Sequence, residues 1–383
     1  MIIEATTPAD VRDAVVTART LGVPFAVYTT GHGGALPERA GEDTDVVVAR
    51  TSTMDGVLVD PDRRTAWVGP GTRWGAVIEA AAPFGLAPLS GTSPTVGVIG
   101  YTLGGGMGWL SRRYGFAADS VVRAEVVTAD GELRTVSADH DADLFWALRG
   151  AGANFGAVTA LEFRLHPVST VYAGVATFAL DRAADVLAFY RDTASARPDE
   201  LTANIVLTKD SLAIRGMYAG PAEDARRALA PLWRVAGTPV TDGWRAMPYT
   251  RSGTVGGTAP HQFSLLPDLP DAVIAASIEA ARSATVEVRL WGGALARPAA
   301  DAGPIGHRDV PFSVVIDGPA APVIEAHATG GSFLNWLHDR SRTHTAYTAG
   351  DLARLHDLKA AYDPANTFGL AKNLAPVTVR QAA

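Results

Sequence analysis

The sequence contains no cysteine, and this absence removes several kinds of chemistry at once. Disulfide bonds, zinc sites with thiolate ligands, iron–sulfur clusters and cysteine nucleophiles all need a sulfur atom that the chain does not have. Basic residues are also in the minority, because 33 Lys and Arg stand against 40 Asp and Glu and no segment concentrates them. Since contacts to phosphates need a basic surface, we expect no nucleic-acid partner.

Long apolar runs are missing as well. Nowhere do about 18 apolar residues follow one another, so we expect no membrane-spanning helix. The first residues lack the basic and then apolar pattern of a secretory signal, and we therefore expect a cytoplasmic protein. The nine histidines form no H-E-x-x-H motif and no close pair, so we expect no metal site.

What the chain has in quantity is glycine, with 39 residues among 383. Many of them gather in three loops, at 29–34, 91–106 and 150–156. Such loops expose backbone N–H groups and let a bulky anion or ring lie against the main chain. One loop of this kind is weak evidence and is as well explained by tight turns, but three in the first half of the chain favour a diphosphate-bearing cofactor.

Familiar nucleotide motifs do not explain these loops. The segment 69–75 lacks the spacing of a G-x-G-x-x-G loop. No P-loop motif occurs, which excludes a P-loop kinase or ATPase, and Thr95 stands where a G-x-S-x-G elbow needs its second glycine. The loops therefore indicate a cofactor site of another type.

The length suits two domains, and the sequence pattern changes near residue 172. In the first part, Thr7 and Pro8 favour the start of a helix that Gly22 ends. Further short strands and helices are expected at 24–28, 46–49, 64–68, 73–82 and 141–149.

Two more expectations concern the end of this first part. Asp130-Gly131 between apolar runs predicts a β-hairpin over 121–136 with a type I′ turn. Leu161, Phe163 and Leu165 alternate with polar residues, which predicts a strand with one solvated face.

The second part reads as strands alternating with helices, which is typical of an antiparallel sheet with helices on one face. The fold class is therefore expected to be α+β. Strands are predicted at 203–208, 212–218, 286–291 and 312–317, and helices at 182–195, 222–232 and 271–283. A last helix is predicted at 351–362, followed by an extended tail that packs back onto the body.

Motifs along nearly the whole chain resemble those of one family. They are Gly31-His32, Pro94–Gly97 with Gly104–Gly106, Val127–Gly131, Asp143–Gly150, Asn154–Gly156, Leu165–Pro167, and Leu358–Pro364 with Asn373. In these motifs the chain resembles FAD-linked oxidases of the berberine-bridge-enzyme type, within the vanillyl-alcohol-oxidase superfamily. The resemblance implies a PCMH-type two-part FAD-binding domain at 1–171, a substrate domain at 172–330, and a C-terminal segment at 331–383 that returns to the FAD domain.

The resemblance also implies which residues contact the FAD. They are Thr29, Thr30, Gly31, His32, Gly33, Gly34, Gly91, Thr92, Ser93, Thr95, Val96, Gly97, Gly100, Tyr101, Gly104, Gly105, Gly106, Gly152, Asn154, Gly156, Val158, Asn335 and Asn373. His32 is similar to the family's histidine that bonds to the flavin 8α-methyl, although a histidine that only hydrogen bonds to the cofactor is the alternative. Ser93 stands where some members have a second, cysteinyl link, so that link is excluded here.

For the reaction, the resemblance implies hydride removal from a C–H next to oxygen or nitrogen of a small secondary metabolite, with dioxygen as acceptor. A base must lie within hydrogen-bond reach of the departing proton, and Tyr101 is the first candidate, with His307 second. Trp336 replaces a tyrosine of the family. Glu287, Arg289 and Trp291 are expected to form the substrate face, with an ordinary solvated sheet face as the alternative.

Two other functions remain open at this point. One is a protein that binds FAD and catalyses a non-redox cyclisation, because the base is not identified securely. The other is a binding protein without cofactor, which the three glycine loops disfavour. The sequence carries no signal for an oligomeric state.

Overall fold

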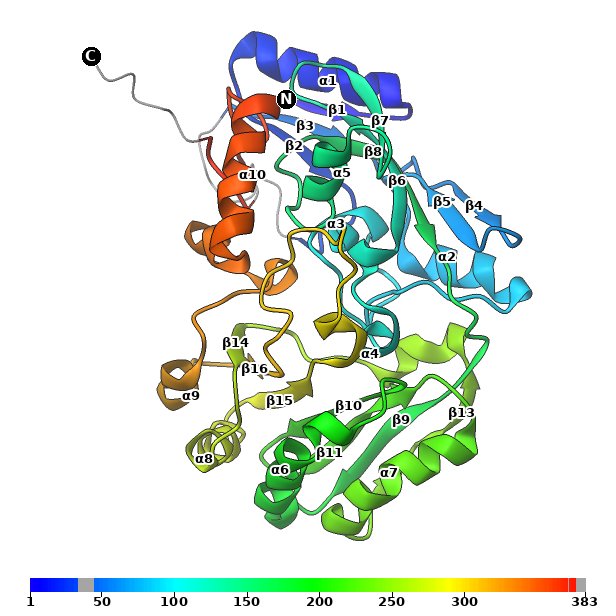
Figure 1. Ribbon diagram of the computed structural model, residues 1–383, viewed down its shortest axis with the longest axis vertical. Helices are drawn as coiled ribbons and strands as arrows, with labels where there is room; N and C mark the ends of the chain where they lie inside the picture. Colours follow the sequence, from blue (N-terminus) through cyan, green and yellow to red (C-terminus); the bar gives the residue numbers. More distant parts are fainter. Residues whose placement is uncertain (34–44, 371, 377–383) are drawn as a thin grey trace.

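The computed structural model describes residues 1–33, 45–370 and 372–376. Within these ranges the strands form three sheets, and Figure 1 shows two of them in the upper half and the largest in the lower half. The smallest sheet is parallel and has the order β1 (Ile2–Glu4), β3 (Val47–Arg50), β2 (Phe25–Tyr28). The second, antiparallel sheet has the order β4 (Val57–Asp60), β5 (Thr65–Val68), β8 (Ala157–Arg164), β6 (Val121–Val127), β7 (Leu133–Ser137).

The first helix follows from local signals in the sequence. In α1 (Pro8–Leu21) the Thr7 side chain accepts from the backbone of Asp10, and the Asp10 carboxylate accepts in return from the Thr7 N–H. Gly22 ends the helix in the left-handed conformation, with φ 67°. The buried face of α1 packs on the parallel sheet. The predicted helix is therefore confirmed. The other helices of this part are α2 (Trp74–Ala81), α3 (Val98–Leu103), α4 (Ser111–Tyr114) and α5 (Ala142–Leu148).

Two local predictions in the second sheet are wrong. The hairpin β6–β7 exists, but Gly131 alone has a positive φ in its turn, whereas a type I′ turn needs two such residues. The Thr128 hydroxyl donates to the Asp130 carboxylate, which also accepts from the Glu132 N–H, and these bonds stabilise a longer loop. Strand β8 is buried on both faces, with only its last residue, Arg164, exposed, so the predicted solvated face is absent.

The buried carboxylate of Glu162 in β8 is paired with two arginines. Glu162 accepts from the Thr65 hydroxyl at 3.1 Å and lies 3.2 Å from both Arg63 and Arg123. Paired in this way, a carboxylate can occupy a buried position that the alternating sequence pattern assigned to solvent.

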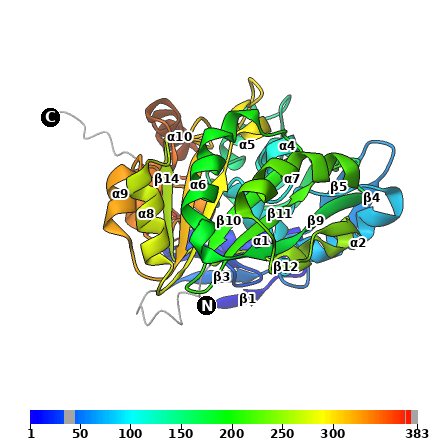
Figure 2. The same cartoon turned by 90° about the horizontal axis from the view of Figure 1, so that it is seen from below.

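The eight-stranded antiparallel sheet matches the predicted sheet and begins with β9 (Thr170–Phe178). Its order is β12 (Thr241–Asp242), β9, β11 (Leu212–Tyr218), β10 (Leu201–Leu207), β15 (Thr285–Leu290), β16 (Phe312–Asp317), β14 (Gln262–Leu266), with β13 (Arg245–Pro248) also on β9. Helices α6 (Ala183–Asp192), α7 (Ala222–Ala236) and α8 (Asp271–Ala280) lie across one face, as Figure 2 shows from below.

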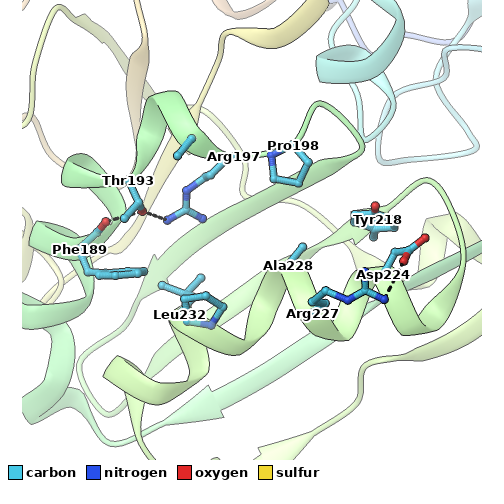
Figure 3. Close-up of a pocket in the computed structure, with 11 residues that line it drawn as sticks. Phe189, Thr193, Arg197, Pro198, Tyr218, Asp224, Arg227, Ala228 and Leu232 are labelled. Atoms are coloured by element: carbon cyan, nitrogen blue, oxygen red, sulfur yellow. Dashed lines mark hydrogen bonds and ion pairs between the residues drawn. The ribbon is translucent and has the colours of Figure 1, made fainter.

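A pocket of about 430 Å³ lies between α6 and α7 on the outer side of this sheet (Figure 3). Its charged groups are engaged within the protein. Arg227 pairs with Glu223 and Asp224, and Arg197 lies over the Tyr190 ring at 4.3 Å. None of the residues that line the pocket belongs to the glycine loops.

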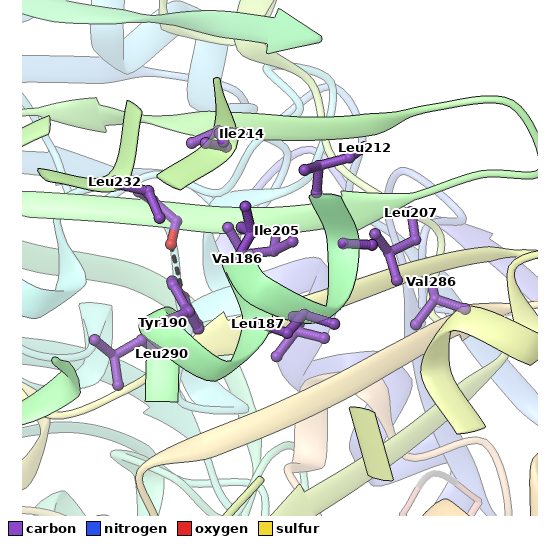
Figure 4. Packing of buried hydrophobic residues seen from close by; sticks show 14 of the residues in the cluster. Val186, Leu187, Tyr190, Ile205, Leu207, Leu212, Ile214, Leu232, Val286 and Leu290 are labelled. Carbon is purple, nitrogen blue, oxygen red and sulfur yellow. Dashed lines mark hydrogen bonds between the residues drawn. The ribbon is translucent and has the colours of Figure 1, made fainter. Parts of the chain in front are cut away.

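The core of this part fills the space between the sheet and its helices. Figure 4 shows Val186, Leu187 and Tyr190 of α6 against side chains of β10, β11 and β15. Tyr190 is fully buried, and its hydroxyl donates to the Ala203 carbonyl at 2.7 Å. The opposite face of the sheet turns toward the first part of the chain and is therefore free to contribute to a site.

The C-terminal segment runs back to the first part of the chain (Figure 1). After α9 (Pro322–His327), helix α10 (Ala349–Tyr362) packs against α5, and Arg354 pairs with Asp143. The predicted helix at 351–362 is thus confirmed and begins slightly earlier. No helix in the described ranges is long and apolar enough to cross a membrane.

Candidate functional site

The first glycine loop and the middle loop lie side by side. His32 Nε2 is 3.0 Å from the Thr95 hydroxyl, which is 2.9 Å from the Ser93 hydroxyl. A Cβ added to Gly97 would approach the Thr30 side chain to 3.3 Å, so Thr30 of the first loop packs on the backbone of the middle loop. Thr29, one residue earlier, binds the Thr51 hydroxyl at 2.8 Å and anchors the first loop to β3. Gly34 lies outside the described residues.

The two ends of the middle loop pack against the ring of Tyr101. A Cβ added to Gly91 would lie 2.9 Å from this ring, and one added to Gly106 would lie 2.5 Å from it. Gly106 also has a φ of +76°, which disfavours any other residue. The glycines at these two positions are therefore explained by the packing of Tyr101, whose ring also meets Trp74 edge-on at 5.5 Å.

Asn335 holds this loop in place from the C-terminal segment. Its side-chain oxygen accepts from the Gly106 N–H at 2.9 Å, and its amide donates to the Tyr101 carbonyl at 2.9 Å. A Cβ at Gly104 would collide with the same amide at 2.7 Å, and one at Gly105 would lie 2.9 Å from the Phe333 ring. Asn335 thus positions the loop that was predicted to contact FAD.

Asn154 holds the third loop in place by hydrogen bonds, as Asn335 does for the middle loop. Its amide donates to the carbonyls of Ala151 at 2.6 Å and Lys372 at 2.9 Å, and its oxygen accepts from the Leu374 N–H at 2.8 Å. These bonds fasten the last described residues to the loop 150–156. Of the remaining predicted positions, Gly152 and Gly156 have positive φ, Val158 lies in β8, and Thr92 lies against Gly257.

The glycine loops have the features that an FAD molecule needs. A Cβ added to Gly33 or Gly100 would meet no atom of the described residues within 4 Å, so nothing in this part of the chain fills that side of either loop. The Tyr101 hydroxyl and the Asn373 side-chain oxygen are buried and have no hydrogen-bond partner in the described part of the chain. Such groups are rare unless a ligand or water completes them. Together with His32 and the hydroxyls of the two loops, they fit a cofactor that has both a polar ring edge and a phosphate chain.

A buried cluster of charged groups lies on the sheet face that turns toward the loops. Glu287 is fully buried, lies 2.5 Å from Arg215 and 3.2 Å from Arg289, and accepts from the Asn204 amide at 2.5 Å. Burial alone would raise the pKa of Glu287, but Arg289 and Arg215 lower it to about 2. The alternative of an ordinary solvated face is therefore wrong.

Aromatic rings connect this cluster to the cofactor loops. The Arg289 guanidinium lies 4.5 Å from the centre of the Trp336 ring, and Trp336 directly follows Asn335. The Trp336 ring is 5.0 Å from the rings of both Phe263 and Phe333. Trp291, by contrast, is fully buried and donates to the Ser313 hydroxyl at 2.9 Å, so it belongs to the core.

The two candidate bases have different surroundings. Burial raises the pKa of Tyr101 well above 10, Tyr249 adds to this, and Arg289 acts in the opposite direction. The positive charge of Arg289 therefore acts on the Tyr101 hydroxyl. His307 has a φ of +58°, and its ring nitrogen lies 2.8 Å from the Thr345 carbonyl. Its assignment as a base stays a prediction, and among the described residues its ring contacts the Thr345 carbonyl rather than a member of the charged cluster.

Sequence reasoning missed Arg215 and Asn204, which complete the cluster. A signal for both was present, because each is a polar residue inside a strand that is otherwise apolar, in LAIRGMY and LTANIVL. A buried polar residue needs a hydrogen-bond or ion-pair partner. Polar residues inside two apolar strands therefore indicate a buried polar cluster. What local sequence does not give is the register that places both beside Glu287.

The comparisons with known proteins agree with this geometry. Residues 1–137 match the family model described as an FAD binding domain. The FAD-linked oxidoreductase OXR1 of Pyricularia oryzae is 30% identical over 426 residues, which cover 96% of this chain and 82% of that protein.

Two solved structures match over 98% of this chain and 91% of theirs. Glucooligosaccharide oxidase of Acremonium strictum, described with a 6-S-cysteinyl, 8α-N1-histidyl FAD, has a TM-score of 0.84 and 25% identity. BBE-like 1 of Physcomitrella patens has a TM-score of 0.84 and 22% identity, and its likeness concerns the fold.

The fold and the paired glycine loops define a flavin-dependent enzyme. The chain belongs to the FAD-linked oxidoreductases, with an FAD-binding domain over residues 1–137, and its fold is that of the berberine-bridge-enzyme-like protein described above. The cysteinyl link of the Acremonium enzyme has no counterpart, because this chain has no cysteine.

Proposed function

We propose that the protein is an FAD-dependent oxidase that removes a hydride from a C–H bond next to oxygen or nitrogen of a small substrate, with dioxygen as acceptor. The observation that carries the proposal is the position of Tyr101. Its hydroxyl is buried and lacks a hydrogen-bond partner among the described residues, its ring packs on Gly91 and Gly106, and the charge of Arg289 acts on it. When bound, the flavin supplies the hydride acceptor, and the protein supplies position and polarity.

The chain's own residues have separate tasks in this proposal. His32, Ser93 and Thr95 hold the cofactor from the two paired loops. Tyr101 donates a hydrogen bond to the bound substrate, because burial keeps its phenol protonated near neutral pH, and the proton that the substrate loses along with the hydride passes to water. Glu287 keeps Arg289 in place and is a weak base, since its pKa of about 2 lies far below the pH at which a general base is effective.

We further propose that His32 bonds covalently to the flavin. His32 is exposed and is oriented by the Thr95 hydroxyl at 3.0 Å, and its other ring nitrogen, which has no hydrogen bond to the described residues, is the one that would react. The histidyl FAD described for glucooligosaccharide oxidase supports this assignment.

The absorbance spectrum of the purified protein tests both proposals. Flavin bands near roughly 370 and 450 nm are expected, and they should stay with the pellet after acid precipitation. In His32→Ala they should move to the supernatant, while the control His327→Ala, at an exposed position on α9, should behave like the wild type.

Two outcomes would contradict these proposals. Bands in the supernatant of the wild type would exclude the covalent link and keep the flavoprotein. A substrate that is converted without anaerobic bleaching of the flavin would favour the non-redox cyclisation instead.

A further inference from the structure

The charges at the substrate face do not balance. In the described part of the chain, the groups that hydrogen bond or ion pair with Glu287 are Arg215, Arg289, Asn204 and Thr258. Two guanidinium groups thus share one carboxylate, and the cluster carries a net charge of about +1. The side chains of Arg215 and Arg289 are only 13% and 9% exposed, so water screens this charge weakly.

The cluster also has hydrogen-bond donors that are not used. The Nε atoms of Arg215 and Arg289 are buried and form no hydrogen bond with the described residues. Arg289 Nε is 3.2 Å from Glu287 Oε1, which is an ion-pair contact without the geometry of a hydrogen bond. The Tyr101 hydroxyl is a third unused donor. A buried positive group with spare donors destabilises a protein unless an anion completes it.

The surroundings limit the shape of such an anion. The Trp336 ring covers one side of the Arg289 guanidinium at 4.5 Å, and the Phe263 ring lies 5.0 Å from Trp336. Flat aromatic walls beside a guanidinium favour a planar group with two acceptor oxygens. A carboxylate has this geometry, and it matches the fork of an arginine better than a single-oxygen acceptor does.

We propose that Arg289, supported by Arg215 and Tyr101, forms a subsite for the carboxylate of a planar, aromatic carboxylic acid. The assignment of this acid as the substrate rests on the proposed oxidase function, whereas its binding does not. Glu287 then has a defined role, because it orients Arg289 and lowers the charge of the cluster enough for the protein to fold.

Isothermal titration calorimetry of the full chain as purified tests the subsite, with benzoate as the probe and benzamide as its uncharged counterpart. The wild type should bind benzoate at least about tenfold more tightly than benzamide, since a hydrogen bond to a charged group contributes this much. In Arg289→Gln the two probes should bind alike. Glu287→Gln removes the competing carboxylate and should tighten benzoate binding.

Further variants separate the subsite from general effects. Arg282→Gln is the matched control, because Arg282 is 75% exposed and pairs with Glu279 on the far helix α8. It should keep the wild-type preference. Arg289→Lys keeps the charge and should keep part of the preference, so a loss in Arg289→Gln is not explained by misfolding alone. Circular dichroism of each variant checks the fold.

The outcomes separate the two proposals. Equal affinities for benzoate and benzamide, no binding of benzoate, or an unchanged preference in Arg289→Gln would each overturn the subsite. A protein that prefers benzoate but takes up no FAD would overturn the oxidase and leave the anion subsite standing. A flavoprotein that binds benzoate no better than benzamide would overturn the anion subsite and leave the oxidase proposal standing.

Discussion

At the scale of single residues, Tyr101 has two roles: its ring determines the packing of the middle glycine loop, and its hydroxyl has a raised pKa. Its ring explains the glycines at 91 and 106, which the sequence assigned to cofactor contact alone. Its hydroxyl has no partner in the described ranges, and burial together with Tyr249 raises its pKa well above 10, while Arg289 opposes them. The phenol is therefore a donor at neutral pH and acts as a base only in alkaline solution.

Tyr101→Phe tests this assignment without disturbing the ring. In a spectroscopic titration of phenolate absorbance, the difference between wild type and variant should show no ionisation of Tyr101 below pH 10, because burial disfavours the charged form. Arg289→Gln should move this ionisation to still higher pH. The control is Tyr172→Phe, at a buried tyrosine beside Trp244 in the eight-stranded sheet. Ionisation of Tyr101 below about pH 9 would contradict the assignment.

At the scale of elements, several residues that carry the family resemblance hold the chain together. Lys359 of α10 is fully buried and donates to the Asp363 carboxylate at 2.6 Å and to the Asn154 carbonyl at 2.8 Å. Asp363 in turn accepts from the backbone N–H groups of Thr367 and Phe368 at 2.7 and 2.9 Å. This clamp joins the C-terminal segment to the third glycine loop.

Lys359→Met leaves the Asp363 carboxylate buried without its counter-ion. We expect the free energy of unfolding to fall by about 3–5 kcal/mol, the usual cost of breaking a buried pair from one side. Urea unfolding followed by circular dichroism measures the change. The control Lys209→Met removes a lysine that is 73% exposed, and it should change the stability by less than about 0.5 kcal/mol. Equal effects of the two substitutions would show that the clamp contributes no stability.

The sequence predicted elements whose signals are local. The cap at Thr7 and the stop at Gly22 define α1, and the structure confirms both. The prediction failed for β8, because an alternating pattern shows which residues share a face but not which side chains cover it, and here Arg63 and Arg123 lie against Glu162. The Arg215–Glu287 pair could not be predicted from the sequence either, because it depends on the pairing of β10 with β11 and β15.

At the scale of the whole molecule, the local and global charges have opposite signs. The chain has a formal net charge of −7, yet the cluster around Glu287 is positive. The overall charge therefore does not attract an anionic substrate, and recognition depends on the buried arginines at short range. Both parts of the chain contribute residues to this site, because Tyr101 belongs to α3 and Arg289 to β15.

Buried tyrosines in both parts make the stability of the whole molecule sensitive to alkali. Burial raises the pKa of Tyr190 and of Tyr249 to about 12, and it raises the pKa of Tyr101 and Tyr347 as well. Between about pH 10 and the pKa of the folded state, each of these tyrosines keeps a proton that the unfolded chain loses. The folded state then binds more protons, so the free energy of unfolding falls as the pH rises.

Thermal unfolding between pH 8 and pH 11.5 measures this loss, with ~1.4 kcal/mol per pH unit expected from each such tyrosine above pH 10. Tyr249→Phe removes one of them, so its stability should fall less steeply with pH than that of the wild type, even though the variant loses the bond to Ser90 and is less stable at pH 8. Tyr28→Phe, at a half-buried position, is the control and should keep the wild-type slope. Parallel slopes for the wild type and Tyr249→Phe would mean that the Tyr249 phenol ionises as easily in the folded protein as in the unfolded chain.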